Sequence, residues 1–325
     1  MKASAVGFAV LVAAAQGFAA TSARAEGWDM PTAYPATNYH TETAVAFAAC
    51  VKGATAGKLD VTVHPNGALF KGNDIKRAVQ TGQAPIGERL ISAHANENPL
   101  FGVDSIPFLA SSFDASEKLW TAARPELEKL LSSQNLVYVY AVPWPPQGLY
   151  TKKPVTTVAD LKGVKFRSYS VATARISELA GMIPVQIEAA DLSQALATGV
   201  ADAFISSGST GFDVKAWEYM TNFYTVDAWL PRNVVFANKD AFDALPADRQ
   251  AAVKKCGDEA AASGLAQAKA LTQKYIDALA ANKMAVSAPG AELKTQLDGF
   301  GKTMTAEWEA KAGPAGKAII DAYEK

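Results

Sequence analysis

The chain has 325 residues, of which 49% are hydrophobic and 19% are charged, and its formal net charge is −1. This balance argues against nucleic acid as a partner, since nucleic-acid-binding proteins carry a basic surface, and against attraction to an anionic membrane. The length exceeds what one hydrophobic core usually holds, so we expect two domains.

The first 25 residues are typical of a secretory signal peptide. A positive charge at Lys2 precedes an apolar run at residues 5–15, and Ala23 and Ala25 form the small-x-small pattern of a cleavage site. The apolar run is shorter than the roughly 20 residues of a membrane-spanning helix. We therefore expect cleavage near Ala25 and a periplasmic, soluble mature chain of residues 26–325.

Two cysteines, Cys50 and Cys256, are present in the chain. An even number of cysteines in an exported protein favours one disulfide. Two separate buried thiols are the alternative, because a free cysteine behaves as a small hydrophobic residue. The even number of cysteines and the expected export of the chain favour the disulfide, but they leave both possibilities open.

Strands and helices alternate over the first two thirds of the expected mature chain. A strand is expected near residue 28, where it leads into a loop that continues to residue 38. Alternating apolar residues predict a strand at residues 58–64, and further strands are expected at the β-rich run 136–142 and at residues 164–169. Helical spacing predicts a helix at residues 41–55, and further helices are expected at residues 74–81, 172–180 and 191–198. This alternation predicts an α/β fold.

The last third of the chain is mainly helical in composition. A stretch rich in Ala, Gln, Lys and Glu follows Pro246, and its high helix propensity predicts one long helix at residues 247–281. Two more helices are expected at residues 291–311 and 315–323. The chain contains no internal repeat.

The sequence lacks the common catalytic and metal-binding motifs. The three histidines, His40, His64 and His94, have no His or Cys at a metal-ligand spacing. Residues 206–209 match a G-x-S-x-G nucleophile elbow only loosely, and neither a P-loop nor a G-x-G-x-x-G is present. Together with export, this pattern favours binding over catalysis, and it identifies no cofactor and no metal ligand.

Five segments in a fixed order carry a resemblance that covers nearly the whole mature chain. They are residues 47–87, IPFL at 106–109, VADLKGVKFR at 158–167, IPVQIEAADLSQALATGVADAF at 183–204, and ALP at 244–246 with the long helix after it. In these segments the sequence resembles the solute-binding proteins of tripartite ATP-independent periplasmic (TRAP) transporters, of the DctP type. The resemblance implies a two-domain periplasmic binding protein (Venus-flytrap) fold, with ligand in the cleft and one long helix spanning both domains.

The resemblance also implies how the chain divides. Domain I is expected to hold residues 26–145 and 231–268, and domain II residues 146–230 and 269–325. Both cysteines then fall in domain I, which favours their pairing.

Arg167 is the residue that we most expect to bind ligand. The resemblance implies that it grips a ligand carboxylate, and a planar guanidinium suits that role because it binds a carboxylate through two donors. A structural salt bridge is the alternative for an arginine at a strand end. Gln147 stands where many relatives have a second arginine. This departure favours a monocarboxylate, since one cationic anchor suits one buried carboxylate.

Other candidate ligand residues lie near the expected cleft. Ser206 or Ser207 replaces an Asn of several relatives, and Glu88 either contacts the ligand or holds Arg89 or Arg167 in place. Aromatic side chains are the remaining candidates, although each packs more often than it contacts ligand, namely Tyr34, Trp144, Tyr169 and Trp229.

The expected function is that of an extracytoplasmic receptor. It binds a small organic carboxylate, expected to be a monocarboxylate with a hydroxyl, keto or aromatic group, and delivers it to the membrane subunits of a TRAP transporter. One alternative is a periplasmic sensor that signals to a membrane kinase. Another is a periplasmic enzyme with Glu88 as its general base, since fold alone does not fix function.

Overall fold

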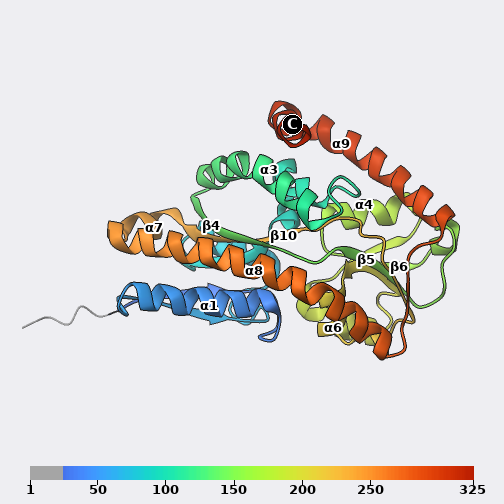
Figure 1. Cartoon of the computed structure of the whole chain (residues 1–325), viewed down its shortest axis with the longest axis horizontal. Helices are drawn as coiled ribbons and strands as arrows, with labels where there is room; N and C mark the ends of the chain where they lie inside the picture. The colour runs from blue at the N-terminus through green and yellow to red at the C-terminus, as the bar shows by residue number, and fades with distance from the viewer. Residues whose placement is uncertain (1–24) are drawn as a thin grey trace, which may run out of the picture.

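A computed structural model describes residues 25–325, so the predicted signal peptide lies outside the described residues apart from Ala25. Two lobes lie end to end along the longest axis, and helix α8 (Ala247–Ala281) runs beside both of them (Figure 1). The lobes are called domain I, which holds α1 (Tyr39–Ala54) and β4 (Leu136–Pro143), and domain II, which holds β5 (Gln147–Thr151), β6 (Lys165–Ser168) and α6 (Gly208–Asp213).

Domain I is built on two small sheets. Strands β1 and β2 pair in parallel, and in the second sheet β10 lies between β3 and β4 and is antiparallel to both. Every residue of β10 is buried because strands cover both of its edges and helices cover its faces. The bounds are β1 Glu26–Pro31, β2 Leu59–His64, β3 Ile86–Leu90, β4 Leu136–Pro143, β10 Arg232–Asn238, α1 Tyr39–Ala54, α2 Ile75–Gln80, α3 Phe113–Ser133 and α7 Lys239–Ala244.

Domain II is built on one mixed sheet in the order β11-β9-β5-β8-β6-β7. Strand β6 is parallel to both of its neighbours, whereas β5 is antiparallel to β8 and β9. Parallel strands need crossover connections, and here α4 and α5 supply them. The bounds are β5 Gln147–Thr151, β6 Lys165–Ser168, β7 Ile183–Gln186, β8 Ala203–Ser207, β9 Asn222–Tyr224, β11 Ala285–Ser287, α4 Val171–Leu179, α5 Leu192–Ala197 and α6 Gly208–Asp213.

Helix α8 ties the two domains together. It packs against α1 and β4 of domain I and against α6 and β11 of domain II. Its close approach to β4 depends on Gly264, because a Cβ there would lie 2.5 Å from a methyl group of Val142. A disulfide between Cys50 and Cys256 joins α8 to α1, with 5.8 Å between the Cα atoms. The predicted disulfide and the predicted long helix are both confirmed.

The chain crosses between the two sheets in two further places. Residues 144–146 connect β4 to β5, and residues 225–231 connect β9 to β10. These segments are hydrogen-bonded to each other, because the backbone N–H of Trp144 donates to Pro231 and that of Gln147 donates to Trp229, at 2.8 and 3.0 Å. The two connections therefore form one short ribbon between the domains.

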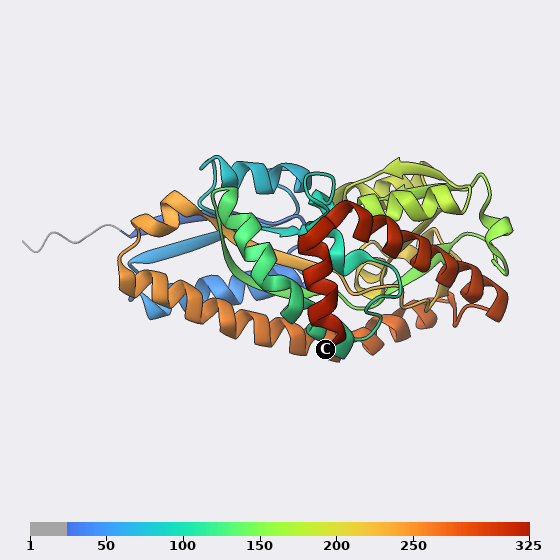
Figure 2. The ribbon, with the colours of Figure 1, turned by 90° about the horizontal axis from the view of Figure 1, so that it is seen from above.

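The C-terminal helix α9 (Ala291–Glu324) bends sharply at Gly313, where φ is 59° (Figure 2). This break falls between the two helices predicted at residues 291–311 and 315–323. Helix α9 packs on α3 of domain I and on α4 of domain II. Within residues 25–325, no helix combines the length and the apolar character that crossing a bilayer requires.

Candidate ligand-binding site

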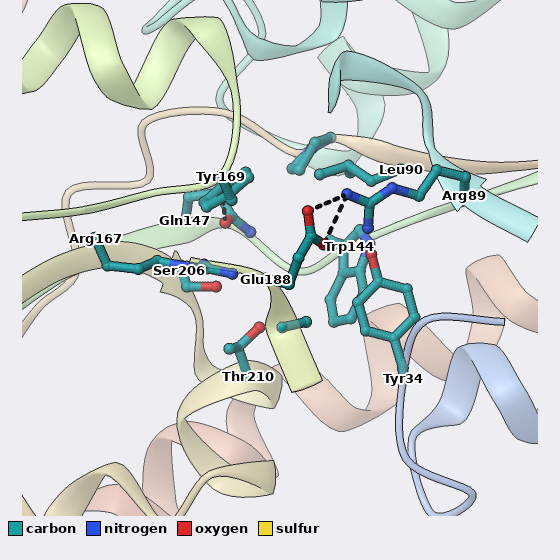
Figure 3. Close-up of a pocket in the computed structure, with 12 residues that line it drawn as sticks. Tyr34, Arg89, Leu90, Trp144, Gln147, Arg167, Tyr169, Glu188, Ser206 and Thr210 are labelled. Atoms are coloured by element: carbon teal, nitrogen blue, oxygen red, sulfur yellow. Dashed lines mark hydrogen bonds and ion pairs between the residues drawn. The ribbon is translucent and has the colours of Figure 1, made fainter. Parts of the chain in front are cut away.

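A small cavity lies between the domains, next to the two connecting segments. Its volume is about 40 Å³, and both domains contribute to its wall (Figure 3). The lining residues are Tyr34, Arg89, Leu90, Trp144, Gln147, Arg167, Tyr169, Glu188, Ala189, Ser206, Thr210 and Pro231.

Arg167 lies near the end of β6 and is 4% exposed. Its Nε donates to the backbone oxygen of Ile187 at 3.0 Å, and its guanidinium lies 4.5 Å from the ring centre of Tyr169. Burial lowers the pKa of Arg167 to about 10, so the side chain still carries its charge at neutral pH. No carboxylate among residues 25–325 forms an ion pair with it. A buried charge without a partner is costly, so this arginine suits an anionic ligand.

The opposite side of the cavity carries an ion pair between the domains. Arg89 at the end of β3 contacts Glu188, which follows β7, with 3.0 Å between Nη2 and Oε2. The same nitrogen donates to Oδ1 of Asn73 at 2.6 Å. Arg89 was expected only as a residue held by Glu88, and Glu188 was not predicted.

The charges of the lining residues leave one net positive charge. Arg89 and Arg167 are cationic and Glu188 is anionic, while the other lining side chains are neutral. Since Arg89 is already paired with Glu188, Arg167 is the cation that has no partner among the described residues. The cavity is therefore complementary to a ligand with a single negative charge.

Neutral polar groups complete the wall. Gln147 donates its amide to the backbone oxygen of Pro145 at 2.9 Å and accepts from the hydroxyl of Tyr169 at 3.1 Å. Ser206 lines the cavity, whereas Ser207 is fully buried and caps helix α6 by accepting from the backbone N–H of Thr210. These groups can donate to or accept from the polar atoms of a small organic ligand.

Two aromatic rings form the domain I wall. The rings of Tyr34 and Trp144 meet edge to face at 4.8 Å. Burial raises the pKa of Tyr34 to about 12, so its hydroxyl stays protonated. Trp229, by contrast, is fully buried and does not line the cavity.

Glu88 lies behind this aromatic wall. Its Oε1 is 3.4 Å from Nδ1 of His40 and accepts from Nδ2 of Asn233 at 3.1 Å. Burial lowers the pKa of His40, so its imidazole is neutral at neutral pH. Glu88 therefore contacts residues that support the wall, rather than Arg89 or Arg167.

The structure brings most of the predicted ligand residues together. Tyr34, Trp144, Gln147, Arg167, Tyr169 and Ser206 line one cavity, and Glu88, Ser207 and Trp229 lie outside its lining. Five further lining residues were not predicted, namely Leu90, Glu188, Ala189, Thr210 and Pro231. Glu188 lies in the segment that carries the resemblance, which is the one signal that could have marked it.

Comparison with known proteins identifies the family. The family model DctP, described as bacterial extracellular solute-binding protein, family 7, matches residues 31–311. The chain belongs to this family, which confirms the expected two-domain periplasmic binding protein fold and the periplasmic location.

The most informative relatives are solved structures. A TRAP solute-binding protein specific for pyroglutamate, from a marine metagenome, is 53% identical; the match covers 93% of this chain and 99% of that chain, with a TM-score of 0.92. DctP6, a Bordetella pertussis receptor binding pyroglutamic acid, is 49% identical over 92% of this chain and 99% of its own, with a TM-score of 0.91. The chain is thus a solute receptor of the TRAP type.

Curated relatives are more distant. The C4-dicarboxylate-binding periplasmic protein DctP of Rhodobacter capsulatus is 27% identical, and the match covers 66% of this chain and 66% of that protein. A solute-binding protein of Albidiferax ferrireducens is 25% identical, over 69% of this chain and 67% of that protein. The matched segment thus spans about two thirds of these relatives.

Proposed function

We propose that this protein binds a small monocarboxylate in the cavity between its domains and delivers it to the membrane permease of a TRAP transporter. The observation that carries the proposal is Arg167, a buried cation without an ion-pair partner in residues 25–325. The lining carries one net positive charge, which balances a ligand with one carboxylate. A ligand with two carboxylates would leave one negative charge unbalanced in a buried site.

Pyroglutamate, a five-membered lactam with one carboxylate, is the proposed ligand. Two relatives at 53% and 49% identity bind this acid. The aromatic wall formed by Tyr34 and Trp144 suits a compact ring. The lactam C=O and N–H also match the donors and acceptors that Gln147 and Ser206 provide.

The proposed mechanism is capture followed by domain closure. Residues 26–145 with 231–268 form domain I in this proposal, and residues 146–230 with 269–325 form domain II. The ribbon of connecting segments is the proposed hinge. Ligand shifts the populations of the open and closed forms only through its different affinity for the two forms. In this proposal ligand binds the closed form more tightly, and the permease recognises the closed, ligand-bound form. This proposal includes no catalytic step.

A thermal-shift panel on the exported protein tests the proposal. Ligand that co-purifies is first removed by unfolding and refolding, and small mono- and dicarboxylates are then added one at a time. Pyroglutamate at about 100 times its dissociation constant should stabilise the protein by roughly 2.7 kcal/mol. Stabilisation by dicarboxylates alone would contradict the proposed ligand class.

A further inference from the structure

The ion pair opposite Arg167 places a carboxylate of the protein inside the ligand cavity. Glu188 comes from domain II and Arg89 from domain I, and in Figure 3 Glu188 projects between Arg89 and Arg167. The side chain of Arg89 is 3% exposed and that of Glu188 is 19% exposed. The pair is thus largely removed from solvent.

The chain encloses this pair closely. Asn73 accepts from the same Arg89 nitrogen that contacts Glu188. A Cβ at Gly72 would lie 2.6 Å from Oε2 of Glu188 and 2.8 Å from Nη1 of Arg89, so only glycine fits beside the pair without a shift. The neighbouring turn is therefore shaped around the two charged side chains.

We propose that Glu188 is a specificity-determining residue that occupies the place of a second ligand carboxylate and so excludes dicarboxylates. This inference rests on the proposed function as a monocarboxylate receptor. With Arg167 free for one carboxylate and Arg89 neutralised by Glu188, a dianion would bring its second charge against that of Glu188. Repulsion between like charges in a site of this kind discriminates against the wrong ligand.

Charge rather than size distinguishes the two ligand classes here. Succinate and pyroglutamate are of similar size, so the cavity volume does not separate them. Replacing Glu188 by Gln keeps the side-chain shape and removes the negative charge. Arg89 then becomes a second cation with a forked set of donors, and two facing guanidinium groups match the two ends of a dicarboxylate.

The test compares affinities for succinate, glutarate and pyroglutamate by isothermal titration calorimetry on ligand-free protein. The variants are Glu188→Gln, Glu188→Ala and the double variant Glu188→Gln with Arg89→Met. Asp191→Asn is the matched control, because Asp191 is an exposed carboxylate three residues after Glu188 and does not line the cavity. Circular dichroism confirms that each variant is folded.

The selectivity ratio is the readout, because loss of a contact between the domains can weaken all ligands together. Affinity for at least one dicarboxylate, relative to pyroglutamate, should rise at least tenfold in Glu188→Gln. The gain should vanish in the double variant and be absent in Asp191→Asn. An unchanged ratio in both Glu188 variants, or an equal gain in Asp191→Asn, would overturn the proposal.

Failure of the proposed function gives a different result. In one case the unaltered protein binds no pyroglutamate, but Glu188→Gln binds a dicarboxylate more tightly than the unaltered protein does. The proposed ligand is then wrong, and the proposed role of Glu188 stands. If the unaltered protein already binds a dicarboxylate more tightly than pyroglutamate, both proposals are wrong.

Discussion

Trp144 donates its indole N–H to Oδ1 of Asn233 at 2.8 Å. The same oxygen lies 3.4 Å from the hydroxyl of Tyr34, and the amide nitrogen of Asn233 donates to Glu88. One buried amide in the central strand β10 thus holds both rings of the aromatic wall.

Asn233→Ala removes the acceptor for both rings and leaves a buried indole N–H unpaired. An unpaired buried polar group costs roughly 1–3 kcal/mol, so we expect the free energy of unfolding to fall by about that amount. We expect ligand affinity to fall as well, by roughly tenfold, because the wall loses its fixed position. Urea denaturation and calorimetry measure the two effects separately. Lower stability with unchanged affinity would show that Asn233 has no role in positioning the wall.

Asp104 predicts a specific pH dependence of stability. Burial raises its pKa from 3.8 to about 6, although Asp104 accepts from the backbone N–H of Arg232 and from the hydroxyl of Ser105. A raised pKa means that the folded chain holds a proton that the unfolded chain has released. The stabilisation is therefore complete below about pH 3.8 and is lost as the pH rises through 6, at a cost of about 2–3 kcal/mol.

Asp104→Asn should remove this contribution. When the pH is raised from 4 to 7.5, the unaltered protein should lose the contribution of Asp104 to its unfolding free energy, whereas the variant has no such contribution to lose. The stability of the variant relative to the unaltered protein should therefore rise by about 2–3 kcal/mol. Guanidinium denaturation at the two pH values measures it. Parallel pH profiles for the two proteins would contradict the assignment.

The disulfide closes a long loop and should stabilise domain I. Cys50 and Cys256 are separated by 206 residues, and their bond constrains the unfolded chain. Replacing both by Ala should lower the unfolding free energy by about 2–4 kcal/mol. Ligand affinity should stay unchanged because neither residue lines the cavity. A double variant that is as stable as the unaltered oxidised protein would show that the bond adds nothing.

Helix α8 requires glycine where it meets β4. Gly264→Ala places a methyl group against Val142, and the overpacking should cost about 1–3 kcal/mol. Gly53→Ala is the matched control, because no atom lies within 4 Å of the Cβ it would add to the exposed end of α1. The control should be neutral or up to about 1 kcal/mol more stable, since Ala is the better helix former. Thermal denaturation of both variants gives the comparison, and equal losses would argue against a close contact at Gly264.

Several regular elements with strong local signals were predicted from the sequence, although the long helix α3 was missed. Residues 247–281 were predicted as one helix because high helix propensity continues without a proline from Ala247 onward. Short strands such as β9 and β11, with three residues each, were missed. Such strands carry too few residues for a periodic pattern, and their pairing with distant segments defines them.

The candidate site was predicted only in part, for a physical reason. Neighbouring side chains of a strand point to opposite faces, so Glu88 and Arg89 cannot both face the ligand. All residues of β3 are buried, and the usual alternation of polar and apolar residues that would orient the strand is missing. Arg89 meets Glu188 across 99 residues of sequence, and only the packing of two domains creates that contact.

Arg167 is the residue on which the proposed function depends most. The most direct test is to measure pyroglutamate binding with and without this side chain. Calorimetry with pyroglutamate on the ligand-free protein should give one site per chain. Arg167→Ala should weaken binding by at least about 100-fold, because the ligand carboxylate loses its buried partner. Arg167→Lys should recover part of the affinity, since lysine keeps the charge and loses the planar fork. Binding of equal strength in the unaltered protein and in Arg167→Ala would contradict the proposed role of Arg167.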